Sequence, residues 1–111
     1  MNATDKRIID MLKGEREGHQ DGIVWNHEYF RYCAGSLRFI DPEKSAHYDE
    51  QSDWWGARES ALFGVIDEKT YETIVGSDWY KDAVQNARES AHKHVKNVAQ
   101  AHLKSLSLWL E

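Results

Sequence analysis

The last 34 residues of the chain, residues 78–111, contain neither glycine nor proline, the two residues that most strongly interrupt a helix. Apolar or weakly polar side chains recur there at intervals of three and four: Val84, Ala87, Ala91, Val95, Val98, Ala101, His102, Leu106, Trp109 and Leu110. At about 1.5 Å per residue, this pattern predicts one helix of about 50 Å. Because such a helix is longer than a small domain is wide, the rest of the chain cannot cover it completely.

Start and stop signals predict shorter helices in the first 40 residues. Thr4 is a suitable N-cap for a helix that runs to about Glu15 and carries an apolar stripe of Ile8, Ile9, Met11 and Leu12. The polar, glycine-containing stretch 15–21 is expected to form a loop. Trp25, Phe30, Cys33, Ala34 and Leu37 then recur at helical spacing, which favours a second helix near 26–38 capped by Asn26, with a pair of strands as the alternative.

The sequence Asp41-Pro42-Glu43 combines a capping side chain, a proline at the first helical position and an acid near the helix N-terminus, so a new helix is expected there. Residues 47–53 are almost wholly polar, which predicts a break near residue 50 and a fresh cap at Ser52. A helical stripe then resumes with Trp54, Ala57, Ala61, Leu62 and Val65. A short element from Asp67 to Val75, ended by Gly76, follows it. The chain is therefore expected to be an all-α single domain, 1–111, of four to five helices with a long C-terminal helix.

Composition limits the classes of protein to consider. The chain has 111 residues, a formal net charge of -5, 41% hydrophobic residues and one cysteine, Cys33. A lone cysteine forms no internal disulfide, and the apolar runs are too short for a membrane span or a signal peptide. We therefore expect a cytoplasmic protein. Its acidic balance also makes direct binding of nucleic acid unlikely, because that binding depends on basic side chains that neutralise phosphates.

The sequence contains no complete motif for a metal site, a phosphate-binding loop or a nucleophile. His92 and His94 would point about 200° apart on a helix, and His102 would lie about 12 Å along the axis from His94, so one ion could not bind all three. The glycines at 14, 18 and 22 are not followed by the Lys-Ser/Thr ending of a phosphate-binding loop. Cys33 lies outside any nucleophile motif. We expect no metal and no cofactor.

Arg88 and His94 resemble the Arg-x4-6-His pattern of HEPN ribonucleases, which are all-α domains of similar size that cut RNA without metal at a dimer interface. The resemblance covers these two residues and no other part of the chain. It would imply that Arg88 stabilises phosphate charge and that His94 is a general acid or base. The alternative is that Arg88 pairs with an acid and that His94 is an ordinary helix residue.

Charge is distributed unevenly, which suggests a protein-binding surface. Residues 41–68 carry eight acids against two bases, whereas residues 90–110 carry three lysines and no acid. The acidic region also contains large aromatic side chains, which supply affinity while the acids steer a basic partner. The predicted partner-binding residues are Tyr48, Asp49, Glu50, Asp53, Trp55 and Glu59.

The sequence thus favours a non-enzymatic inhibitor or adaptor that binds another protein with a basic surface. Small acidic chains of this kind are often phage or mobile-element accessory proteins that block a host nucleic-acid-handling or defence complex. A third hypothesis is a nucleic-acid-binding regulator that uses Lys93, Lys96 and Lys104. A homodimer is also expected, formed along the end of the last helix by Val98, Leu106, Trp109 and Leu110.

Overall fold

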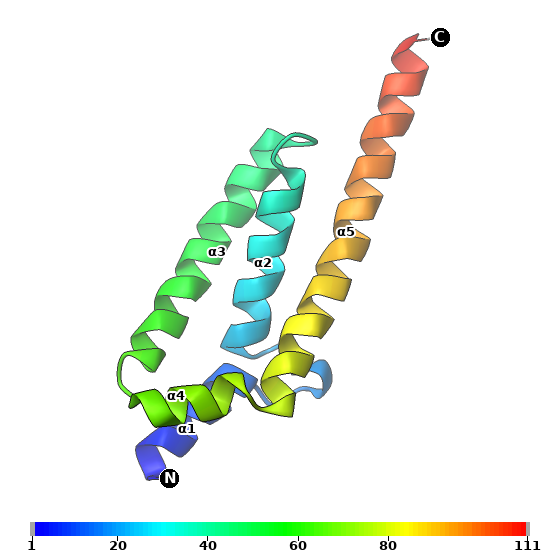
Figure 1. The fold of residues 1–111 in the computed structure, drawn as a ribbon. Coiled ribbons are helices and arrows are strands. Elements are labelled where there is room, and N and C mark those ends of the chain that lie inside the picture. The colour runs from blue at the N-terminus through cyan, green and yellow to red at the C-terminus, as the bar shows by residue number, and fades with distance from the viewer. Residues whose placement is uncertain (1, 111) are drawn as a thin grey trace.

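A computed structural model describes residues 2–110, with residues 106–110 described by their backbone, and is all-α over this range. Five α-helices and one short 3-10 helix follow one another along the chain: α1 (Ala3–Lys13), η1 (Glu17–His19), α2 (Ile23–Leu37), α3 (Pro42–Phe63), α4 (Glu68–Val75) and α5 (Asp78–Leu110). The predicted fold class and the long C-terminal helix are confirmed (Figure 1). Residues 23–37 form a helix, so the alternative of two strands there is wrong.

Two of the predicted caps are wrong by a few residues. Thr4 lies inside α1, and the Asn2 side chain instead accepts a hydrogen bond from the Asp5 backbone N–H at 2.8 Å. Asn26 lies inside α2, which begins after Gly22, and its side-chain amide donates to the Gly22 carbonyl at 2.8 Å. Asn2 is thus the N-cap of α1, whereas Asn26 lies in the first turn of α2 and binds a backbone carbonyl before it.

Helix α3 is continuous, so the predicted break near residue 50 is wrong. Its inward face repeats at intervals of three and four, but only its last position is aliphatic: Ser45, Tyr48, Ser52, Trp55, Glu59 and Leu62. Ser52 is buried within the helix and does not cap it. Ser45 donates to the Ala34 carbonyl of α2 at 2.7 Å. The polar stretch 47–53 therefore stays helical because its inward positions are satisfied by packing and hydrogen bonds to other helices.

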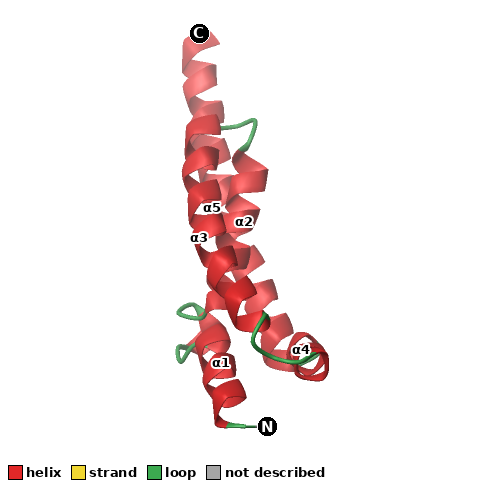
Figure 2. Ribbon diagram, turned by 90° about the vertical axis from the view of Figure 1, so that its left-hand side faces the viewer, coloured by secondary structure: helices red, strands yellow, loops and turns green. Residues whose placement is uncertain are grey.

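The helices α2, α3 and α5 run lengthwise beside one another, and α1 and α4 lie at the end where the chain begins (Figures 1 and 2). Helix α2 packs against both α3 and α5. Buried side chains form two clusters. The first contains Ile8, Leu12, Ile23, Val24, Ile74 and Ala83, and the second contains Cys33, Leu37, Ala91 and Val95. Helices α2 and α5 contribute to both clusters, and α2, which packs against both α3 and α5, is the central helix of the fold.

The link between α1 and α2 folds back tightly on itself. Gly14 ends α1 with a φ of 75°, a conformation that favours glycine. The Asp21 side chain accepts hydrogen bonds from the backbone N–H groups of Glu15 and Arg16, and these bonds lower the pKa of Asp21. The turn brings Gly22 close to the backbone of the last turn of α1. The predicted polar loop is therefore a compact turn, which the Asp21 carboxylate stabilises by hydrogen bonds to the backbone.

The C-terminal end of α5 extends beyond α2 and α3 (Figure 1), as its length predicts. Leu103, near the start of this extension, is 64% exposed. Three of the residues expected to form a homodimer, Leu106, Trp109 and Leu110, have side chains outside the described residues. The fourth, Val98, packs against the second core cluster. Val98 therefore contributes to the core of its own chain.

Cys33 is buried in the second core cluster, and burial raises the pKa of its thiol to about 11. Because the thiolate is the reactive form, we expect native protein at pH 8 to react with iodoacetamide at least about a hundredfold more slowly than the same protein in denaturant. Mass spectrometry of timed samples measures both rates. Equal rates would show that the thiol is open to solvent in the folded protein.

Candidate functional site

Three of the six predicted partner-binding residues form an exposed acidic group on α3. Asp49, Glu50 and Asp53 are all exposed, and none of them forms an ion pair with the part of the chain that the structure describes. Other acids have internal partners: Asp41 and Asp67 cap helices, and Glu28 and Glu59 bind basic side chains. The charge of the three exposed acids is therefore available to solvent or to another molecule.

Two further predicted residues are occupied inside the fold. Tyr48 is half-buried, and its hydroxyl shares a hydrogen bond of 2.6 Å with Nε2 of His94 on α5. The Glu59 carboxylate lies 3.2 Å from Nδ1 of His27 on α2, and this hydrogen bond raises the pKa of His27. The structure thus places Tyr48 and Glu59 at contacts between helices, where each has a role in packing.

The exposed ring of the tryptophan pair is Trp54, not Trp55. Trp55 packs against the first core cluster, whereas Trp54 is 48% exposed. The Arg58 guanidinium carbon lies 3.1 Å from the Trp54 ring centroid, and Arg58 also donates to the Trp54 carbonyl. Consecutive residues on a helix point about 100° apart, so only one of the two rings can face the core directly. We define the acidic α3 surface as Asp49, Glu50, Asp53 and Trp54.

Most of the apolar stripe predicted over residues 54–65 is exposed. Trp54, Ala57 and Ala61 are exposed on α3, Val65 is exposed in the turn after it, and of the predicted stripe only Leu62 packs against a core cluster. The inward face was not apparent from the sequence because serine, tyrosine and glutamate occupy four of its six positions. An exposed apolar stripe beside acids is typical of a surface that binds another protein.

Arg88 and His94 do not meet within one chain. Arg88 Nε donates to Glu28 Oε1 on α2 at 2.8 Å, whereas His94 binds Tyr48 on α3. Their separation by about 120° around α5 explains why they contact different helices. The Glu28 contact raises the pKa of Arg88, so this guanidinium stays charged. Within one chain, the two side chains are not placed to act on a common phosphate.

Sequence reasoning did not identify a charged cluster between α2 and α5. The Glu28 side chain is 11% exposed, and its carboxylate binds Arg31 on its own helix and Arg88 across the helix pair. The spacing of Glu28 and Arg31 is a signal that could have suggested the first contact. Glu28 and Arg88 are 60 residues apart, and no local pattern predicts their contact. We refer to Glu28, Arg31 and Arg88 as the arginine cluster.

The histidines of α5 take part in contacts between helices. His92 lies 3.3 Å from the Tyr32 hydroxyl, and His102 donates to the Asp41 carboxylate at 3.1 Å. Within residues 2–110, no group of three or more His, Cys, Asp or Glu side chains is placed to hold a metal ion. These histidines form polar contacts that hold α5 against α2 and α3.

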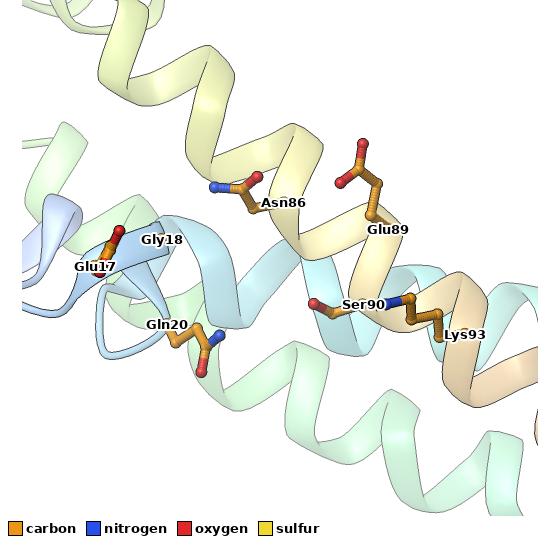
Figure 3. A pocket seen from close by; sticks show the side chains of 7 residues that line it. All are labelled: Glu17, Gly18, Gln20, Asn86, Glu89, Ser90 and Lys93. Atoms are coloured by element: carbon orange, nitrogen blue, oxygen red, sulfur yellow. The ribbon is translucent and has the colours of Figure 1, made fainter.

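A shallow pocket of about 400 Å³ lies between η1 and α5, shown from close by in Figure 3. Its lining includes Glu17 and Gln20 on one side and Asn86, Glu89 and Lys93 on successive turns of α5. Two carboxylates accompany a single ammonium group there, so the pocket has no concentrated charge. None of the predicted partner-binding residues lines it.

Comparisons with models of protein families, with curated proteins and with solved structures found no match to this chain. In the described part of the chain, no helix is both long enough and apolar enough to span a membrane. Any functional proposal therefore depends on the geometry of the surface itself.

Proposed function

We propose that the chain is a non-enzymatic binding protein whose acidic α3 surface binds a basic surface on another protein. The observation that carries this proposal is the group of three exposed carboxylates, Asp49, Glu50 and Asp53, beside the half-exposed ring of Trp54. Carboxylates on one surface attract a basic partner over a distance, and a neighbouring aromatic ring supplies contact area.

The net charge of -5 strengthens this attraction, since it adds to the local field of the acidic α3 surface. The continuous helix α3 also holds the carboxylates at fixed spacings, so little ordering is needed on binding. A protein surface that binds nucleic-acid phosphates is positively charged, so a row of carboxylates is complementary to it. We therefore propose an inhibitor or adaptor of a nucleic-acid-handling protein, of the kind that phages and mobile elements carry against host defence.

The triple variant Asp49→Asn, Glu50→Gln, Asp53→Asn tests the proposal. The partner is first captured from a lysate of the host with the tagged wild-type protein, and its association rate is then measured by surface plasmon resonance. We expect the variant to associate at least about tenfold more slowly at low salt, because the steering charge is lost. The difference should shrink as salt screens the charges.

A matched control removes three exposed acids elsewhere: Asp10→Asn, Glu72→Gln and Asp82→Asn. This control has the same net charge as the first variant, so an equal loss of rate would show a general charge effect and would contradict a specific surface. Association of the first variant at the wild-type rate would also overturn the proposal.

A further inference from the structure

The arginine cluster fixes two guanidinium groups on one buried carboxylate. Arg31 binds Glu28 through Nε and Nη2 at 3.0–3.3 Å, and Arg88 binds the same carboxylate through Nε at 2.8 Å. The Glu28 side chain is largely buried, whereas the side chains of Arg31 and Arg88 are 59% and 50% exposed. Along α2, Glu28 lies between Val24 of the first core cluster and Cys33 of the second. Both guanidinium groups are therefore held on rigid parts of the fold and face solvent.

This arrangement leaves positive charge and hydrogen-bond donors unused. Two guanidinium groups and one carboxylate sum to a charge of +1. Arg88 uses Nε for Glu28, and its Nη groups have no acceptor within the described residues. A guanidinium presents its remaining N–H groups in a planar fork that matches two oxygens of a phosphate or carboxylate. The cluster thus presents preorganised donors to an anion.

The surface beside the cluster is hollowed. A shallow pocket of about 320 Å³ is lined by Glu28, Arg31, Tyr32, Gly35, Ser36 and Arg88. A Cβ added at Gly35 would meet nothing within 4 Å, so a ligand can approach the α2 backbone at this point. A second hollow shares Tyr32 and Arg88 and continues to His92 and Lys93 on α5. Lys93 adds a further positive charge at the edge, and Tyr32 and His92 add aromatic surface.

We propose that this pocket binds the phosphoryl group of a small phosphate ester, with Arg31 and Arg88 as its principal ligands. Two fixed guanidinium groups suit the several oxygens of a phosphoryl group, and the shallow hollow lined by Tyr32 and His92 has room for the rest of a nucleotide-sized molecule. The ligands lie on α2 and α5, so the proposal does not depend on partner binding by the acidic α3 surface, although Asp49 lines a neighbouring hollow together with Arg31 and Gly35.

A small ester fits the charge distribution better than a nucleic-acid strand does. The chain has a net charge of -5, and Glu89 is one of the residues that line the second hollow. A polyanion that extends past the cluster would meet this negative charge at each further phosphate. A single phosphoryl group places its charge on Arg31 and Arg88 alone.

Solution NMR of the full chain tests the proposal with inorganic phosphate and adenosine 5′-monophosphate as probes. We expect both to shift the side-chain Nε–H signals of Arg31 and Arg88, with phosphate binding in the range of about 1–10 mM and the nucleotide more tightly. The Arg7 Nε–H signal, on α1, should not move. If no Arg31 or Arg88 signal shifts at 50 mM phosphate, or if Arg7 shifts equally, the proposal is overturned.

Arg88→Lys keeps the charge but removes the planar fork, and we expect it to weaken nucleotide binding about tenfold. Arg7→Gln, which removes an exposed charge on α1, should bind as the wild type does. Thermal unfolding of both variants checks the fold, and the wild-type arginine signals provide the decisive result even if Arg88→Lys is unstable. Binding of a single-stranded oligonucleotide with no response to either small probe would overturn the proposal in favour of a nucleic-acid site.

Discussion

Replacement of Gly22 by alanine is expected to destabilise the fold by about 3 kcal/mol or more. A Cβ at this position would lie 2.6 Å from the Leu12 carbonyl oxygen and from the carbonyl carbon and oxygen of Lys13. These are backbone atoms at the end of α1, and they cannot rotate away as a side chain does. The added methyl group can be accommodated only if α1 moves away from the start of α2.

Such a movement would open the first core cluster, because Leu12 is fully buried there against Ile23 and Val24. Urea unfolding followed by circular dichroism measures the change in free energy. A matched control is Gly35→Ala, inside α2, where a Cβ meets nothing within 4 Å. Alanine favours helix more than glycine does, so this control should gain up to about 1 kcal/mol. A Gly22→Ala variant as stable as the control would show that the turn is looser than described.

The parts of the fold that the sequence predicts well are those controlled by local chemistry. Asp41 caps α3 with Pro42 in its first turn, Asp67 caps α4, and Gly76 ends it, all as expected. The absence of glycine and proline from residue 78 onward similarly predicts the whole of α5. Each of these signals acts within one helix, so no knowledge of the other helices is needed.

The continuity and the orientation of α3 could not be predicted because they depend on other helices. Ser52 is buried against neighbouring helices, and Tyr48 is satisfied by His94, which is 46 residues away. Hydrophobicity alone therefore singles out Trp54, Ala57 and Ala61, which lie on the exposed face of α3. The same limit applied to Glu28, whose contact with Arg88 joins residues 60 apart. Asp49, Glu50 and Asp53 of the predicted site are exposed as expected, and this could be predicted because it depends on no contact with another helix.

Alanine substitution of the two adjacent tryptophans is expected to separate stability from binding. Trp55→Ala should lower the free energy of unfolding by about 3 kcal/mol, because its ring packs against the first core cluster and its loss leaves a cavity. Trp54→Ala should cost less than about 1 kcal/mol, since its half-exposed ring contributes only its contacts with Arg58 and with the edge or face of Trp55.

For binding to the captured partner, the order of the two variants should be reversed, once any unfolded fraction has been corrected for. We expect Trp54→Ala to weaken binding at least about tenfold, because an exposed aromatic ring at the centre of an interface commonly supplies much of its affinity. Trp55→Ala, assayed at a temperature at which it remains folded, should weaken binding less than Trp54→Ala does, because the Trp55 ring packs against the core and only supports the Trp54 ring from its side. Urea unfolding and surface plasmon resonance on the same preparations measure both quantities. If Trp54→Ala bound normally while the triple acid variant associated slowly, carboxylates alone would provide the recognition, and the exposed apolar stripe of α3 would lie outside the interface.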